Sequence, residues 1–122
     1  MTMPITGYHT LFYSTEVEAF RAVMRDVFEL PHMTFDDGFA IFDCPKTTME
    51  PHPGPPEFDI HPSDRVTHEV GFVCEDMEAT VEELRAKGIQ FRGEVRDEGW
   101  GKVIIMALPG GVEMLLTEPV PD

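Results

Sequence analysis

The stretch VTHEVGFVCEDMEATVEELRAKG, residues 66–88, decides the fold of this chain. Its first eight residues are rich in β-branched and aromatic side chains, which favours a strand over 66–73. Glu75 and Asp76 then supply an acidic helix start, and the residues that follow place Met77, Thr80, Val81 and Leu84 on one stripe. Gly88 suits the left-handed position that ends many helices. The stretch therefore predicts a strand followed by an amphipathic helix.

Three further strands are predicted after this helix. Apolar and alternating residues occur at 91–95, 102–108 and 112–117, and Pro109-Gly110-Gly111 supplies the turn between the last two. The second half of the chain thus reads strand, helix, strand, strand, strand.

The first half repeats this order. A strand is expected over 8–13, and Thr15 to Glu18 fits a capping box for a helix that must end before Pro31. Short strands are expected near Phe35, at 39–42 and at 47–50, with a tight turn at 37–38. Aligning the two helix starts pairs residues 16–19 with 76–79, and a histidine opens the strand before each helix. These correspondences indicate an internal duplication.

We therefore predict an α+β fold of two tandem βαβββ modules, forming a curved mixed sheet around a central cavity. Module one covers about 5–53, a proline-rich connector about 51–64, and module two about 65–119. At 122 residues and 42% hydrophobic content, the chain can bury one core, so residues 1–122 are expected to form a single domain. One helix for several strands leaves a sheet face uncovered, which makes a homodimer the expected assembly.

The charge of the chain limits its partners. A net charge of -14 repels phosphate backbones and anionic lipids, so neither nucleic acid nor a membrane is an expected partner. No apolar run approaches the roughly 20 residues that cross a bilayer, and no secretory leader is evident, so we expect a cytoplasmic protein. Cys44 and Cys74 lack partners at metal-ligand spacing and are expected to be free thiols.

The two strand-opening histidines, His9 and His68, are candidate metal ligands. Strand alternation is expected to turn both away from the helices, and the duplication would bring them together about a pseudo-twofold axis. The alternative is that each is an ordinary, partly buried histidine at a strand end. When the last strands of the two halves are aligned, Glu50 and Leu115 occupy equivalent positions.

Further residues could contact a substrate. Glu113, two positions before Leu115, is a candidate base, and His52 is a candidate acid or base because an imidazole titrates near neutral pH. Trp100 lies between two glycines and could close over a ligand, and Tyr13 and Phe72 could form apolar walls. Ordinary packing or solvent exposure is the competing interpretation for each of them.

These motifs together resemble the vicinal oxygen chelate superfamily. The histidine strand, the helix after it, the Pro-Gly-Gly hairpin and the closing Glu-Met-Leu-Leu strand carry the resemblance, which spans nearly the whole chain. It implies that His9, Glu50 and His68 hold a divalent metal ion, with Fe, Mn, Ni and Zn all possible. The fourth ligand position of glyoxalase I falls on Leu115, which cannot bind metal.

Two functions are compatible with this resemblance. The first is a metal-dependent lyase or dioxygenase that acts on a small substrate with vicinal oxygens, and two histidines with one glutamate are similar to the ligand set of extradiol dioxygenases. The second is a metal-free protein, similar to bleomycin-resistance proteins, that sequesters a small cationic compound. The reaction type and the substrate stay open at this point.

Overall fold

The computed structural model describes residues 10–49, 51 and 69–120, which form helices and two β-sheets. The predicted α+β class is confirmed. Within these residues no helix is long and apolar enough to cross a membrane.

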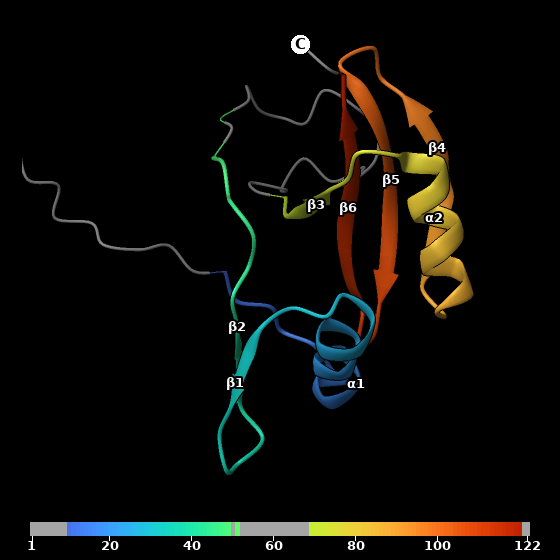
Figure 1. Ribbon diagram of the computed structural model, residues 1–122. Helices are drawn as coiled ribbons and strands as arrows, with labels where there is room; N and C mark the ends of the chain where they lie inside the picture. The colour runs from blue at the N-terminus through green and yellow to red at the C-terminus, as the bar shows by residue number, and fades with distance from the viewer. Residues whose placement is uncertain (1–9, 50, 52–68, 121–122) are drawn as a thin grey trace, which may run out of the picture.

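A four-stranded sheet forms the centre of the molecule (Figure 1). Its strands are β3 (Gly71–Val73), β4 (Gln90–Asp97), β5 (Gly101–Leu108) and β6 (Val112–Pro119), arranged in the order β3-β6-β5-β4. β3 runs parallel to β6, while β6 with β5 and β5 with β4 are antiparallel. All four strands lie where the sequence predicts them. β3 begins at Gly71, and residues 66–68 of the predicted range lie outside the described residues.

Helix α2 (Met77–Ala86) connects β3 to β4 and packs on one face of this sheet. Its N-cap is Asp76, whose carboxylate accepts a hydrogen bond from the Ala79 backbone N–H at 3.1 Å. Gly88 follows the helix with φ of +95°, a conformation that favours glycine. The sequence prediction for this helix is confirmed at both ends.

A second helix covers the same face of the sheet. It consists of α1 (Val17–Ala22) and a π-helical turn, η1 (Val23–Val27), and it ends before Pro31 as predicted. The predicted capping box does not form, because no side chain caps this helix. Instead the helix start is tied to the β5–β6 turn, where the Ser14 hydroxyl donates to the Pro109 carbonyl at 2.8 Å.

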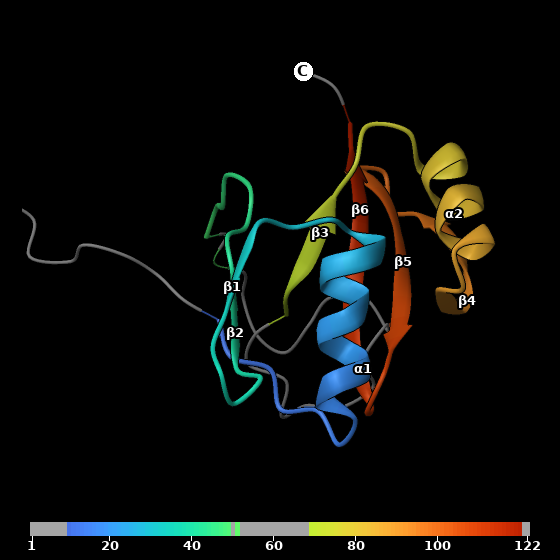
Figure 2. The same ribbon diagram turned by 60° about the horizontal axis from the view of Figure 1, so that its bottom comes forward.

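The main core lies between the two helices and the sheet (Figure 2). Its buried side chains come from both helices, from the segment after α2 and from one face of β5 and β6: Phe20, Met24, Met77, Val81, Leu84, Ile89, Ile104, Met106, Leu108, Val112, Met114 and Leu116. The alternate positions of β5 and β6 therefore point to the other side of the sheet.

A separate hairpin completes the described part of module one. β1 (His32–Thr34) and β2 (Ala40–Phe42) pair antiparallel across the predicted turn, in which Gly38 has φ of +90°. In both views β5 and β6 lie between the hairpin and α2, and Phe42 of the hairpin packs against the main core (Figures 1 and 2). Residues 10–13 and 47–49 form no strand, in contrast to the sequence prediction, so the described part of this module has two strands.

β4 lies at one edge of the four-stranded sheet and is irregular. Its pairing with β5 shifts between Arg92 and Arg96, and Gly93 within the shift has φ of +77°. The irregularity is a β-bulge, and it places both Arg92 and Arg96 opposite residues on the helix-free side of β5.

Candidate functional site

The sheet face turned away from the helices, called the second face here, carries Val103, Ile105, Glu113, Leu115 and Thr117. Val103 and Ile105 are buried, and Leu115 packs against them. This small apolar cluster forms the floor of the second face. Glu113 therefore lies on the same face as Leu115, as their spacing of two residues requires.

A charged pair lies beside this floor. Arg92 of β4 is opposite Ile105, and its Nη1 atom donates to both carboxylate oxygens of Glu113, at 3.0 and 2.9 Å. The Glu113 side chain is 29% exposed and that of Arg92 is 54% exposed. The pair orients the carboxylate but contributes little to stability, because exposed ion pairs are strongly screened.

A second glutamate, Glu69, lies just before β3. Gly71 pairs with Leu115, and the Leu115 N–H donates to the Val70 carbonyl at 3.0 Å, so the contact with β6 extends to Val70. Continuing this register by two residues would set Glu69 opposite Glu113. The Oε2 atom of Glu69 is buried.

Glu69 was not among the site residues predicted from the sequence. Val70 and Phe72 pack against the core beneath the helices, not on the second face where alternation was expected to place them with His68. Glu69 and Gly71 alternate with them. Glu16 and Asp76 are aligned at the two helix starts and are 60 residues apart. The same offset of 60 residues aligns His9 with Glu69 and not with His68.

Trp100 lies in the tight turn between β4 and β5. The turn is closed by a hydrogen bond from the Glu98 N–H to the Gly101 carbonyl at 2.9 Å, and the Val120 N–H donates to the Trp100 carbonyl at 3.1 Å. Gly101 is required by close packing, because a Cβ atom there would lie 2.8 Å from the Glu118 carbonyl oxygen. The indole is 49% exposed on a firmly held turn.

The two aromatic residues predicted as cavity walls lie in different environments. Tyr13 is 87% exposed in a segment without regular structure. The Phe72 ring packs on Phe28, with the ring centroids 4.8 Å apart, and belongs with the main core. The structure therefore does not bring these two side chains together.

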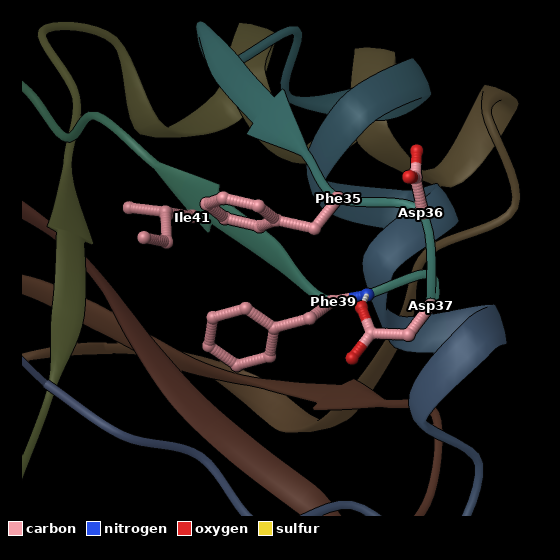
Figure 3. A pocket seen from close by; sticks show the side chains of 5 residues that line it. All are labelled: Phe35, Asp36, Asp37, Phe39 and Ile41. Atoms are coloured by element: carbon pink, nitrogen blue, oxygen red, sulfur yellow. Dashed lines mark hydrogen bonds between the residues drawn. The ribbon is translucent and has the colours of Figure 1, made fainter.

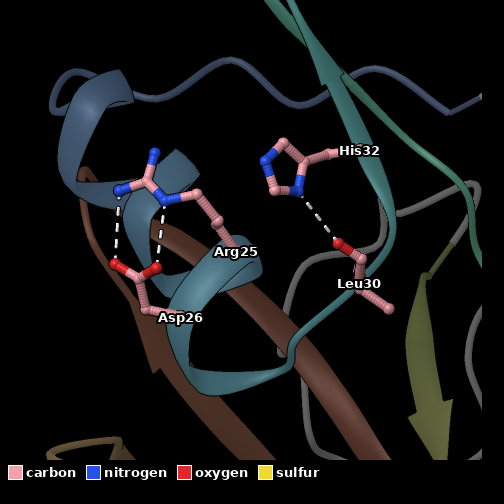
Figure 4. A network of polar contacts seen from close by, with 4 residues as sticks. All are labelled: Arg25, Asp26, Leu30 and His32. Atoms are coloured by element: carbon pink, nitrogen blue, oxygen red, sulfur yellow. Dashed lines mark hydrogen bonds and ion pairs between the residues drawn. The ribbon is translucent and has the colours of Figure 1, made fainter.

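The predicted metal ligands His9, Glu50 and His68, and the predicted acid or base His52, lie outside the described residues. The one histidine within them is His32, on β1 (Figure 4). Its Nδ1 atom lies 3.2 Å from the Leu30 carbonyl oxygen. Nearby, Arg25 holds Asp26 through two hydrogen bonds, which lowers the pKa of that carboxyl.

One acidic cluster with converging oxygens occurs within the described residues. Carboxylate atoms of Asp76, Glu78 and Glu118 lie within 4.8 Å of one another at the start of α2. Asp76 and Glu118 accept backbone hydrogen bonds from this helix start, the latter from the Met77 N–H at 2.7 Å. Glu78 pairs with Lys102 at 3.0 Å, which lowers the pKa of Glu78 and raises that of Lys102. The cluster therefore serves as a helix cap.

Comparison with known proteins gives a consistent result. The family model for the Glyoxalase/Bleomycin resistance protein/Dioxygenase superfamily matches residues 9–119. A crystal structure of a glyoxalase/bleomycin resistance protein/dioxygenase from Nocardioides is 17% identical with a TM-score of 0.54, over 95% of this chain and 87% of that one. An integron cassette protein from the mobile metagenome of V. cholerae is 10% identical with a TM-score of 0.54, over 97% and 98% of the two chains. None of the curated proteins matches the chain.

Proposed function

Because the chain belongs to the Glyoxalase/Bleomycin resistance protein/Dioxygenase superfamily, we propose that it is a metal-dependent enzyme acting on a small substrate with vicinal oxygens. The observation that supports this proposal most directly is the Glu113 carboxylate, which Arg92 orients on the second face beside an apolar floor. Membership alone does not select a reaction, so the proposed chemistry depends on these side chains.

The second face fits a divalent cation in its charge and donor type. Glu113, oriented by Arg92, supplies carboxylate oxygens at this face. Carboxylate and imidazole are suitable ligands for Mn, Fe, Ni and Zn. A bound ion would supply Lewis-acid stabilisation of negative charge on two neighbouring substrate oxygens.

We assign the ligands as His9 and Glu50 from module one and Glu69 from module two. Glu69 replaces His68 in this assignment, because Val70 and Phe72 pack against the core and strand alternation would turn residue 68 to the same side. Glu113, held by Arg92, is the proposed group that moves the substrate proton, with His52 as a second acid or base. Trp100 and Tyr13 are the proposed apolar contacts to the substrate, and a homodimer is the proposed assembly.

Metal analysis of protein purified without an affinity tag or chelator tests this proposal. We expect about one divalent ion per chain, and we expect His9→Ala and Glu69→Gln to lose it. His68→Ala should keep the ion. Glu78→Gln is the matched control, because it alters the acidic cluster at the start of α2 and should also keep the ion.

Binding of tropolone, a chelator with two neighbouring oxygens, tests the substrate class. Calorimetry should detect tropolone binding to the metal-loaded protein and not to the Glu69→Gln variant. Metal-free wild-type protein would contradict the enzyme proposal and favour the sequestering alternative. Loss of metal in His68→Ala with retention in Glu69→Gln would contradict the strand register on which the ligand assignment depends.

A further inference from the structure

The bulge in β4 brings two arginines together on the second face. In a regular strand, Arg92 and Arg96 would be about 13 Å apart, with residue 94 between them on the same face. Here Arg92 pairs with Ile105 and Arg96 with Val103, which are consecutive second-face positions of β5. Consecutive positions on one face of a strand are about 7 Å apart. The bulge therefore places the two arginines at neighbouring positions.

The residues that precede these arginines confirm the face. Phe91 packs against the main core, beneath the helices. Val95 lines a hollow together with Val81 of α2, so it also lies on the helix side of the sheet. Successive side chains of a strand point to opposite faces, so Arg92 and Arg96 belong to the second face, beside its apolar floor.

Arg92 extends across the neighbouring strand and keeps one edge of its guanidinium open. Its partner Glu113 belongs to β6, and β5 lies between β4 and β6. Both hydrogen bonds to Glu113 come from Nη1, at 3.0 and 2.9 Å. Within the described residues, the edge formed by Nε and Nη2 makes no hydrogen bond. This edge has two parallel N–H groups, the arrangement to which a carboxylate binds with both oxygens.

Arg96 supplies a second set of donors at the same place. Its ion pair with Glu98 is made through Nε, which lies 2.9 Å from the Glu98 Oε1 atom. The two terminal nitrogens of the guanidinium form its other donor edge. The Arg96 side chain is 44% exposed, so this edge is open to a ligand on the second face.

We propose that Arg92 and Arg96 together bind the carboxylate of the substrate, whose body lies on the apolar floor. This inference rests on the proposed function and names its substrate class, which is small carboxylic acids with vicinal oxygens. The carboxylate accepts from Nε and Nη2 of Arg92 and from the terminal nitrogens of Arg96. Glu113 keeps its contact with Nη1. A planar guanidinium matches the geometry of a carboxylate, which a lysine ammonium does not.

The charge of the site favours a single carboxylate over more highly charged ligands. Glu113 and Glu98 each offset the charge of one guanidinium, so the arginines bind through directed N–H groups and not through an excess of positive charge. A phosphate ester carries about two negative charges at neutral pH. A chain of net charge -14 repels such a ligand more strongly than a monocarboxylate.

An apolar hollow on the β1–β2 hairpin has the opposite charge (Figure 3). It is lined by Phe35, Asp36, Asp37, Phe39 and Ile41. Its two aspartates repel a carboxylate, and its lining includes no lysine or arginine. Binding of a carboxylate is therefore expected at β4 and not at the hairpin.

The probe for a direct test is 2-naphthoate, which has an apolar body and a carboxylate but no further oxygen beside it. Calorimetry should detect its binding to the full chain both before and after metal removal by a chelator, because the arginines hold the carboxylate. The neutral 2-naphthamide should bind about fivefold or more weakly. The dianion 2-naphthyl phosphate should bind no more tightly than 2-naphthoate. Amide chemical shifts should change most at residues 92–96 and 103–105.

Four variants separate this site from the rest of the surface. Arg92→Gln and Arg96→Gln should each weaken 2-naphthoate binding about fivefold. Arg92→Lys keeps the positive charge but loses the two-donor edge, so it should weaken binding about as much as Arg92→Gln. Arg25→Gln is the matched control, because Arg25 is also 44% exposed and paired with a carboxylate but lies on η1, and it should leave affinity unchanged. Thermal melting checks that each variant is folded.

Two outcomes of the binding experiments would overturn the proposal. One is equal affinity for 2-naphthoate and 2-naphthamide, and the other is 2-naphthoate binding that stays unchanged in both Arg92→Gln and Arg96→Gln. Tighter binding of 2-naphthyl phosphate would assign the arginines to a phosphate group and contradict the carboxylate.

Metal analysis tests the proposed function separately. Protein that is metal-free as purified, yet binds 2-naphthoate through Arg92 and Arg96, would contradict the enzyme and support the carboxylate site. Metal-loaded protein whose 2-naphthoate binding does not depend on the arginines would contradict the carboxylate site alone.

Discussion

Replacing Gly71 by alanine should separate β3 from β6. A Cβ atom at this position would lie 2.6 Å from the Leu115 carbonyl oxygen and 2.8 Å from the Leu115 Cβ atom. Because the nearest of these atoms belongs to the backbone of a central strand, side-chain rotation cannot relieve the contact. The strands must move apart, and their ladder includes only three residue pairs.

The expected cost follows from this geometry. Overpacking of this kind costs about 1–3 kcal/mol. For a chain of this size, that loss lowers the melting temperature by about 5–15 °C. Urea denaturation, monitored by circular dichroism, gives the free energy of unfolding. Hydrogen exchange of the backbone amides reports directly on the pairing of β3 with β6. The Leu115 amide, which donates to Val70, should exchange faster in the variant.

Val73→Thr is the matched control for this experiment. Val73 lies on the same strand, is 73% exposed, and its replacement keeps a β-branched side chain, so the change should stay within about 0.5 kcal/mol. Unfolding of Gly71→Ala at the same urea concentration as wild type, with the Leu115 amide still protected, would contradict this expectation. Gly71→Ala should also weaken metal binding, because Glu69 lies on the displaced segment.

Three smaller predictions concern single contacts. Asp76→Ala removes the cap of α2 and should lower the free energy of unfolding by about 1 kcal/mol, measured in urea. Burial raises the pKa of the Cys74 thiol, so at pH 8 a thiol-reactive reagent should modify the exposed Cys44 faster, as read by peptide mass spectrometry. Lys102→Gln should raise the pKa of Glu78 in an NMR titration. Because pairing depresses the folded pKa of Glu78, the stability it contributes is present above its unfolded pKa and lost as the pH falls through the folded value.

Module two could be predicted closely from the sequence because its patterns are strong and local. Period-two alternation in β5 and β6 and period-3.6 spacing in α2 each identify one buried side. The Pro-Gly-Gly turn and Gly88 then set the ends of these elements. In β4 the predicted range is too short, because the bulge at Gly93 interrupts the alternation that defines a strand.

Module one was predicted less well because its strands depend on distant partners. Residues 10–13 and 47–49 have strand-like composition, yet composition does not provide the neighbour that a strand requires. In place of the predicted capping box at Thr15, Ser14 contacts the β5–β6 turn. The Ser14 hydroxyl donates to the carbonyl of Pro109, which lies 95 residues further along the chain. Such a contact cannot be read from local spacing.

For the candidate site, Glu113 was named from the sequence, while Glu69 and Arg92 were not. Shifting the alignment of the two halves by one residue pairs His9 with Glu69 in place of His68. One step along a strand turns a side chain to the opposite face. Arg92 could not be identified because its partner follows it by 21 residues on a strand that is not its direct neighbour.

The bulge in β4 also affects how this molecule behaves at high concentration. An outermost strand leaves one row of backbone groups available to a strand from another molecule, which is how many aggregates begin. Here the bulge twists that row, and Arg92, Glu94 and Arg96 place alternating charges along it. Shortening the segment between Arg92 and Arg96 by two residues, so that a single residue faces Ile104, would straighten the strand and open the sheet edge to fibril growth.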